Sequence, residues 1–256
     1  MARVLAVVNQ KGGVGKTTTS VNLAAALAQA QRRVLLVDLD PQGNATMGSG
    51  IDKRSLARTV YHLLLGLAEF TGVRVRVERG GFDMLPANRE LAGAEIELVE
   101  LPRRETRLKE ALDGVRGEYD FVLIDCPPSL SLLTVNGLSA AQRVVIPMQC
   151  EYYALEGLSD LVATIKRVRA NLNPELEIAG LLRTMYDPRN TLSQQVSQQL
   201  EQHFGDKVYR TLVPRNVRLA EAPSYGVPAV LWDEASKGAQ AYVALAAEIL
   251  AQGQAA

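Results

Sequence analysis

Short runs of Val, Ile and Leu alternate along this chain with longer segments in which apolar residues recur at helical spacing. None of these runs shows the strict polar alternation of a strand with one face in water, so we expect strands that are buried on both faces. They cover residues 4–8, 34–37, 121–124, 144–147, 178–182 and 208–213. Helices are expected at residues 16–29, 103–115, 155–172, 191–204 and 238–250. The alternation predicts an α/β fold, a mostly parallel twisted sheet with helices on both faces.

Length and composition favour one domain without membrane segments. The 256 residues contain no internal repeat, charge block or Pro/Gly/Ser-rich linker, so we expect a single domain over residues 1–256, with an ordered core from about 2 to 250 and no separate DNA-binding domain. The 28 basic residues balance 28 acidic ones, which leaves any nucleic-acid contact to a local patch. Cys126 and Cys150 are too few for a disulfide framework, which indicates a reducing cytoplasm. No apolar run reaches about 18 residues, so we expect no membrane span.

A glycine-rich loop lies where the first expected strand ends and the first helix begins. Its glycines permit close backbone approach, and its N–H groups together with the helix N-terminus form a nest for phosphate oxygens. Lys16 would lie against the β- and γ-phosphates, and the Thr17 hydroxyl would complete a magnesium shell. The expected nucleotide contacts are Lys11, Gly12, Gly13, Val14, Gly15, Lys16, Thr17 and Thr18. The motif therefore predicts a P-loop NTPase domain with a three-layer architecture that binds a magnesium-nucleotide complex.

This loop departs from the common pattern, because Gln10 stands where the first glycine is expected and a second lysine, Lys11, follows it. Two ammonium groups serving one nucleotide in one chain would repel each other, unless Lys11 reaches a phosphate held by another subunit. The loop resembles that of the deviant Walker A ATPases, a superfamily of partition, division-site and nitrogenase iron proteins. The resemblance implies that Lys11 acts across the interface of a nucleotide-sandwich homodimer in the ATP state.

Acidic residues follow two further expected strands. Asp38 and Asp40 lie on the same side of an extended chain, at the carboxyl edge of the sheet where ligands bind. The stretch resembles the Walker A′ segment, and we assign Asp40 to the hydrolytic water and Asp38 to support of the metal and the loop. Residues 121–124 followed by Asp125 match a Walker B strand, with Asp125 as a magnesium ligand. Cys126 is interpreted as a small packing residue.

The base-binding region is expected late in the chain. The chain lacks the Asn-Lys-x-Asp tetrapeptide that reads guanine in Ras-type NTPases, which favours adenine and hence ATP. Asn216 offers a donor and an acceptor, as the adenine edge requires, but it is equally consistent with a helix cap.

Four segments together carry a closer resemblance, to the ParA/Soj partition ATPases: residues 9–19, 38–46, 149–157 and 214–223. The resemblance implies that Pro214 and Asn216 lie at the adenine, and that residues 149–157 belong to the dimer face and to a surface read by a ParB-type centromere-binding partner. It also implies slow ATP hydrolysis that this partner accelerates, and it locates the protein on the nucleoid. Residues 53–81 match the family least and receive no function.

DNA binding is expected from the resemblance rather than from charge alone. Between residues 160 and 219 the chain carries nine Lys/Arg against six Asp/Glu, a surplus typical of an ordinary solvated surface. The family binds double-stranded DNA without sequence preference as ATP dimers, through arginines that match Arg189 and Arg218. Dimerisation would double this weak patch.

Three other functions stay open at this stage. A membrane-surface regulator of the MinD type requires a basic amphipathic C-terminal helix, but no Lys or Arg follows Lys237 and the apolar stripe of the last helix is expected to dock on the core. An iron–sulfur carrier is disfavoured by the placement of the two cysteines. A small-molecule kinase or ligase lacks an identifiable acceptor pocket.

Overall fold

The protein is built around one eight-stranded sheet. The computed structural model describes residues 2–252. Residue 1 and residues 253–256 of the expected domain lie outside the described residues. The strand order is β3-β4-β2-β5-β1-β6-β7-β8, and all neighbours are parallel except the antiparallel pair β3 and β4. The strands are β1 (Arg3–Val7), β2 (Val34–Asp38), β3 (Val75–Val77), β4 (Phe82–Leu85), β5 (Phe121–Asp125), β6 (Arg143–Gln149), β7 (Glu177–Tyr186) and β8 (Val208–Pro214).

Helices connect the strands and cover both faces of the sheet. The α-helices are α1 (Lys16–Gln29), α2 (Asn44–Gly48), α3 (Val60–Leu64), α4 (Phe70–Val73), α5 (Leu91–Glu97), α6 (Arg107–Asp113), α7 (Leu132–Ala140), α8 (Ala154–Asn171), α9 (Thr191–Phe204), α10 (Val217–Glu221), α11 (Ala229–Trp232) and α12 (Lys237–Gln252). Three 3-10 turns complete the set within residues 2–252: η1 (Leu98–Glu100), η2 (Gly205–Lys207) and η3 (Ala222–Tyr225). The predicted α/β class is thus confirmed.

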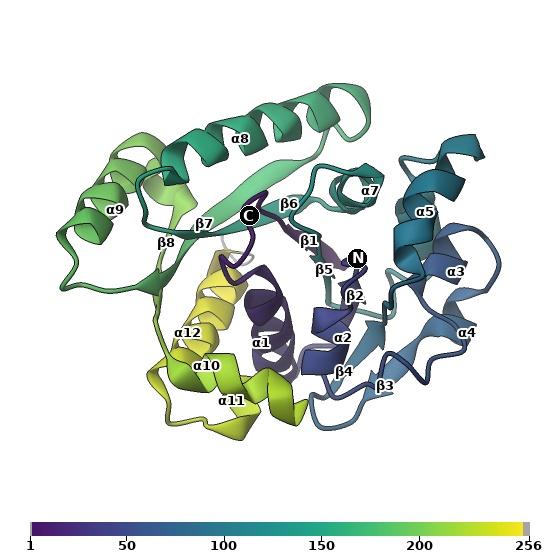
Figure 1. Cartoon of the computed structure of the whole chain (residues 1–256), viewed down its shortest axis with the longest axis horizontal. Helices are drawn as coiled ribbons and strands as arrows, with labels where there is room; N and C mark the ends of the chain where they lie inside the picture. Colours follow the sequence, from purple (N-terminus) through teal and green to yellow (C-terminus); the bar gives the residue numbers. More distant parts are fainter. Residues whose placement is uncertain (1, 253–256) are drawn as a thin grey trace.

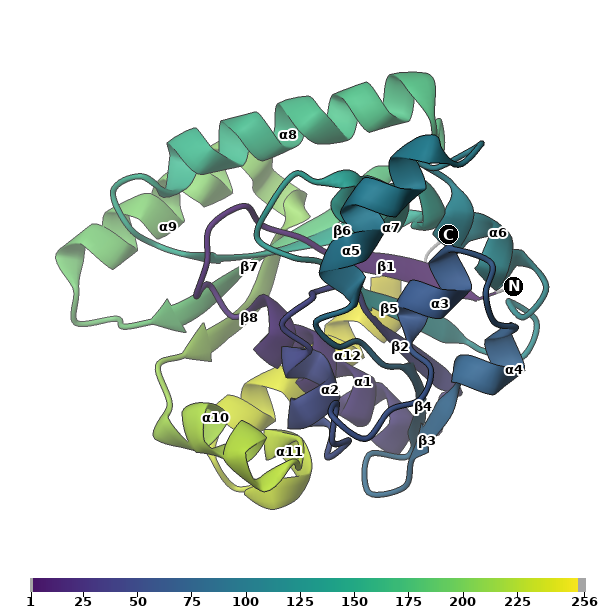
Figure 2. The same cartoon turned by 45° about the vertical axis from the view of Figure 1, so that its right-hand side comes forward.

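Side-chain alternation along β1 shows how the sheet separates two cores. Val4 and Ala6 join the core formed with α3 to α9, whereas Leu5 and Val7 join the core formed with α1 and α12. Figure 1 shows α7 and α8 on one side of the sheet and α1 and α12 on the other, and the turned view in Figure 2 agrees. Burial on both faces explains why the strands carry unbroken apolar runs.

All six predicted strands are present, and each extends the predicted range by one to a few residues or shifts by one. Helices 16–29 and 191–204 match their predicted bounds, whereas the helix predicted at 103–115 is shorter, Arg107–Asp113. The sequence analysis missed β3 and β4, the helices α2 to α5, and α7. These elements are short, so they offer too few turns or alternations for a periodic signal.

Gly180 shows how tightly β7 packs against the edge strand β8. A Cβ added there would lie 2.6 Å from Cε2 of the Tyr209 ring on β8, and Tyr209 is 2% exposed. We therefore expect Gly180→Ala to lower the free energy of unfolding by about 2 kcal/mol, because overpacking forces the ring or the strand to shift. Urea denaturation measures this.

Gly157 on α8 is the matched control, since no atom lies within 4 Å of a Cβ added there. Gly157→Ala is expected to raise stability by up to about 1 kcal/mol, through helix propensity. An unchanged urea midpoint for Gly180→Ala would show that the strand pair yields without cost.

Candidate nucleotide site

The glycine-rich loop leaves β1 and enters α1 with an open concave side. Gly13 and Gly15 have φ values of 73° and 86°, which side chains rarely adopt. A Cβ added at Gly12 or Gly13 would meet no atom within 4 Å, so the loop faces free space. The side chain of Lys16 is drawn into the loop, where its Nζ donates to the carbonyl oxygen of Lys11 at 2.9 Å. The Lys11 carbonyl oxygen thus accepts the bond from Lys16 Nζ that a phosphate oxygen would accept in a nucleotide complex.

Three strand ends bring the predicted acidic residues to the loop. Asp38 and Asp125 are register partners at the ends of β2 and β5, and Val7 at the end of β1 pairs with Asp125. Both carboxylates are fully buried, and Asp40 is 8% exposed. The predicted convergence of the loop, the A′ segment and the B strand at the carboxyl edge of the sheet is therefore seen in the structure.

Asp125 has the environment of a metal-binding carboxylate. Its Oδ1 accepts from Ser20 Oγ at 2.8 Å, while its buried Oδ2 has no hydrogen-bond partner. An orphaned buried oxygen is costly unless a ligand satisfies it. Within residues 2–252 no group of three or more His, Cys, Asp or Glu side chains is placed to hold a metal alone. The site fits Mg²⁺ of the kind that is bound by one or two protein groups and completed by phosphate oxygens and water.

Asp38 holds the loop that carries Asp40. Its Oδ2 accepts from the Thr46 backbone N at 2.9 Å and from Thr46 Oγ1 at 2.7 Å, and its Oδ1 accepts from the Asp40 backbone N at 3.1 Å. These bonds agree with the predicted role of Asp38 in supporting the loop. Its predicted role in supporting the metal stays a prediction. Asp40 Oδ1 in turn accepts from the Gln42 backbone N at 2.9 Å, which fixes the predicted hydrolytic carboxylate.

Burial dominates the electrostatics of this site. It raises the pKa of Asp125 to about 8, with the charge of Asp38 as a second cause, and it raises the pKa of Asp38 to about 6. Burial also lowers the pKa of Lys16, against the opposing charges of Asp125 and Asp40. The nucleotide-free site thus holds several charges at a desolvation cost, which a bound magnesium-nucleotide would offset.

A pH dependence of stability follows from these shifts. Because both carboxyl pKa values are raised by folding, the stabilisation from their protonated forms is complete below about pH 4 and is lost as the pH rises toward about 8. We expect the free energy of unfolding of the nucleotide-free protein to fall by at least about 2 kcal/mol between pH 5 and 8. Urea denaturation across this range checks it. Asp125→Asn should flatten the decline, and parallel curves for the two proteins would contradict the assignment.

The predicted adenine region forms a cavity of about 190 Å³ next to the phosphate loop. Pro214 and Asn216 line it from the end of β8, and its other walls include Gly15, Thr18, Thr184 and Tyr242. Asn216 Oδ1 accepts from the backbone N of Arg218 and of Leu219 at 2.9 and 3.3 Å, so it caps α10. The helix cap and the adenine contact, the two roles that the sequence left open for Asn216, are therefore compatible. The cap uses the side-chain oxygen as acceptor, so only the Nδ2 donor is left for the adenine base.

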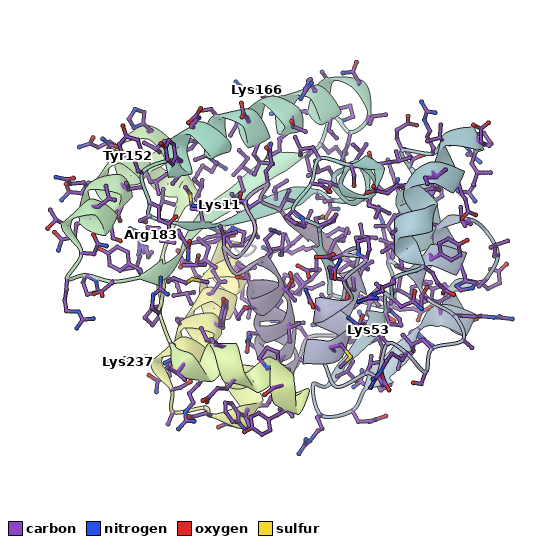
Figure 3. All side chains as sticks on the ribbon, viewed as in Figure 1. Lys11, Lys53, Tyr152, Lys166, Arg183 and Lys237 are labelled. Atoms are coloured by element: carbon purple, nitrogen blue, oxygen red, sulfur yellow. The ribbon has the colours of Figure 1, made fainter. Side chains whose placement is uncertain are left out.

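Lys11 is placed by a contact that the sequence did not indicate. Its ammonium forms an ion pair with Glu151 of the same chain, and the two side chains are 47% and 48% exposed. Figure 3 shows Lys11 near the centre of the view and Tyr152, which follows Glu151 in the chain, on the segment that precedes α8. The reach of Lys11 to a second copy stays a prediction.

The remaining predicted residues lie apart from the loop. Arg189 is on the β7–α9 connection and Arg218 on α10, with side chains 89% and 51% exposed. Cys126 and Cys150 are free and buried, and burial raises the pKa of both thiols. The packing interpretation of Cys126 agrees with this burial.

Sequence reasoning missed several residues of the site. Ser20 lies one helical turn after Lys16, a spacing that could have indicated it. Tyr242 on α12 contacts Thr19 by a hydroxyl–hydroxyl bond of 3.1 Å, and Thr184 Oγ1 donates to the Val14 carbonyl at 2.8 Å. Nothing in the local sequence of either residue points to the loop, since both reach it only through the tertiary fold.

Comparison with known proteins was made against this geometry. A family model described as an AAA domain matches residues 2–178. The Soj sporulation initiation inhibitor of Bacillus subtilis is 54% identical over 253 residues, covering 99% of this chain and 100% of that protein. The chromosome partitioning protein ParA of Caulobacter vibrioides (strain NA1000 / CB15N) is 53% identical over 252 residues, covering 98% of this chain and 94% of that protein.

A crystal structure from Mycobacterium smegmatis, named as a cobyrinic acid a,c-diamide synthase with bound ADP and magnesium, superposes with a TM-score of 0.87. It is 43% identical, and the match covers 99% of this chain and 96% of that one. Its bound ligands agree with the loop, the orphaned Asp125 oxygen and the neighbouring cavity, so ATP and Mg²⁺ are the cofactors and the protein is an ATPase. With full-length identities above one half to partitioning proteins, the chain belongs to the ParA/Soj family of chromosome-partitioning ATPases.

Proposed function

We propose that this protein is an ATP-controlled switch for DNA partitioning. Mg-ATP joins two copies in a sandwich dimer, the dimer binds double-stranded DNA on the nucleoid without sequence preference, and hydrolysis returns monomers that release the DNA. The observation that supports it most directly is the presence of two lysines in one phosphate loop. Lys16 is buried inside the loop, whereas Lys11 stands half exposed at its rim.

The position of Lys11 suits a role between subunits. Its own nucleotide already has Lys16, and a second ammonium on the same phosphates would meet repulsion. The ion pair with Glu151 is half exposed and therefore weak, so a triphosphate on a facing copy would compete with it effectively. Each subunit would then contribute one cation to the terminal phosphoryl group of the other.

Asp40 is the residue proposed to orient the attacking water. It is nearly buried, its loop is fixed through Asp38, and its charge acts on Lys16. Bound Mg²⁺ would neutralise charge that develops on the phosphates, with Thr17 and Asp125 as its protein partners. Positioning rather than covalent chemistry would carry the reaction, which fits a slow ATPase that a ParB-type partner accelerates.

A surface for such a partner is present beside Lys11. Tyr152 and Tyr153 are 75% and 69% exposed, with ring centroids 5.0 Å apart in an edge-on arrangement. Exposed aromatic pairs are favourable contacts in protein interfaces. Because Glu151 precedes these rings and binds Lys11, a protein docked on them would lie close to the dimer-forming lysine.

The membrane-surface alternative loses its main candidate. Tyr242, Leu245 and Ile249 of the apolar stripe of α12 are each at most 1% exposed and pack into the core with α1. Among residues 2–252, no helix is long and apolar enough to cross a membrane. The stripe therefore docks on the protein, as the sequence predicted, and is not available to a lipid surface.

DNA retention with ATP and with ADP tests the proposal. Wild-type protein should be retained on duplex DNA with ATP, and most of this retention should be lost with ADP. Lys11→Ala should still bind ATP but elute as a monomer in gel filtration and lose the ATP-dependent retention. Equal retention in both nucleotide states, or ATP-dependent dimers of Lys11→Ala, would contradict the proposed switch.

A further inference from the structure

Both arginines proposed to contact DNA are held by carboxylates of their own chain. Arg189 uses Nε and Nη2 to donate to Asp187 Oδ1 and Oδ2 at 3.0 and 2.9 Å, a two-pronged contact. Arg218 donates from Nη1 to Glu221 at 3.1 Å, and its Nε lies 3.1 Å from Asp233 Oδ2. Two nitrogens of each guanidinium group are therefore already engaged with carboxylates.

Asp187 lies near two arginines, Arg189 and Arg215. Tyr186 at the end of β7 pairs with Pro214 at the end of β8, which brings the residues after each strand close together. Hydrogen bonds from Arg189 lower the pKa of Asp187 to about 2, and the charge of Arg215 adds to this effect. Asp187 thus pairs with Arg189 and also lies within the electrostatic influence of Arg215.

The second arginine is surrounded in the same way by α10 and α11. In addition to its two carboxylates, the Arg218 guanidinium lies 5.5 Å from the centroid of the Trp232 ring, which itself stacks on Tyr225 at 4.8 Å. The contacts come from residues on both sides of Arg218 in space, Glu221 on its own helix and Asp233 after α11. Its charge is therefore compensated locally.

We propose that Asp187 and Asp233 are intramolecular competitors for the DNA-binding arginines and set the DNA affinity of each subunit to a low value. This inference rests on the proposed DNA-binding function. A carboxylate matches the planar fork of arginine as a phosphate does, so the two compete for the same donors. Exposed ion pairs are weak enough for a phosphate to displace them, but their carboxylates repel the DNA backbone until they are displaced. Single subunits would then bind poorly, and only the doubled surface of a dimer would hold DNA.

Asp187→Asn is a suitable test because it removes the charge and preserves the turn. Asp187 Oδ1 accepts from the Arg189 backbone N at 2.9 Å, and an asparagine oxygen can accept the same bond. The matched control is Asp113→Asn, which makes an equal change in net charge. Asp113 pairs with Arg116 at 3.3 Å at the end of α6, a helix that packs against α7 rather than beside β8.

Retention on short duplex DNA is measured with ATP over a range of salt concentrations. Asp187→Asn and Asp233→Asn should each bind at least about fivefold more tightly than wild type, and the salt dependence should steepen by about two in log–log slope per dimer, one phosphate contact per subunit. Asp113→Asn should stay within about twofold of wild type. Arg189→Gln should weaken DNA binding on its own and by more when combined with Asp187→Asn, because an arginine that has no carboxylate to leave contacts phosphate more fully.

Each contrary result has a defined meaning. Equal gains for Asp187→Asn and Asp113→Asn would reduce the effect to net charge and overturn the inference. Weaker DNA binding by Asp187→Asn would mean that the carboxylate orients Arg189 for phosphate, which also overturns it. If wild type binds DNA with ATP and the variants do not differ from it, this inference fails alone, whereas absence of ATP-dependent retention in every protein rejects the proposed function together with it.

Discussion

Lys16→Ala is expected to abolish ATP hydrolysis and to weaken ATP binding by more than about 100-fold, because it removes the buried cation that we assign to the terminal phosphates. Lys16 is 7% exposed and lies under the influence of Asp125 and Asp40. Alanine would remove the ammonium group from the loop and leave the charge of Asp40 unopposed there, so a polyanion would lose its attraction to the site. Equilibrium binding of a fluorescent ATP analogue and phosphate release measure the two effects.

Lys166→Ala is the matched control for this substitution. Lys166 is an exposed lysine on α8 and is labelled in Figure 3. Its removal should leave ATP binding unchanged. Thermal unfolding of the nucleotide-free proteins separates a folding defect from a loss of the site, since removal of a desolvated ammonium should not lower the stability of Lys16→Ala severely. Near-normal ATP affinity of Lys16→Ala would contradict the phosphate-loop assignment.

Asp40→Asn is expected to lower the rate of ATP hydrolysis by roughly 10² to 10⁴-fold while leaving ATP binding intact. Asparagine retains the oxygen that accepts from the Gln42 backbone N, a bond of 2.9 Å, so the loop should keep its shape while losing the base. In the proposed cycle the variant accumulates as an ATP-bound dimer. Phosphate release and gel filtration with ATP measure the two consequences.

The control for Asp40→Asn is Asp52→Asn. Asp52 lies after α2, is about half exposed and pairs with Arg54 at 3.0 Å. Its neutralisation should leave hydrolysis within about twofold of wild type. Hydrolysis by Asp40→Asn at the wild-type rate would assign the orientation of water to another residue, and loss of ATP binding would make Asp40 a structural member of the loop.

The strands and the chemical motifs could be predicted because their signals are local. A strand buried on both faces must be apolar along its length, as residues 121–124 are, and the residue that follows it at the carboxyl edge is available for chemistry. The same logic located Asp38 at the end of β2 and the glycine loop after β1. Short elements such as α2 and β3 were missed, because their conformation depends on packing against the sheet rather than on their own periodicity.

The side-chain partners could not be predicted, since they join residues far apart in sequence. Lys11 and Glu151 lie on different crossover connections, and Asn216 serves both the adenine cavity and the cap of α10. The orphaned oxygen of Asp125 becomes visible only when Ser20 is seen to occupy the other one.

The sequence by itself determined the fold class, the phosphate loop and the order of acidic residues along the chain, because apolar runs and glycine conformations act over a few residues. Only the tertiary structure decided how charge is distributed among them. It buried Asp38 and Asp125 side by side, paired Lys11 with Glu151, and placed Asp187 and Asp233 on the two exposed arginines. The energy of a charge depends on its depth and on its nearest opposite charge, and both are properties of the folded chain.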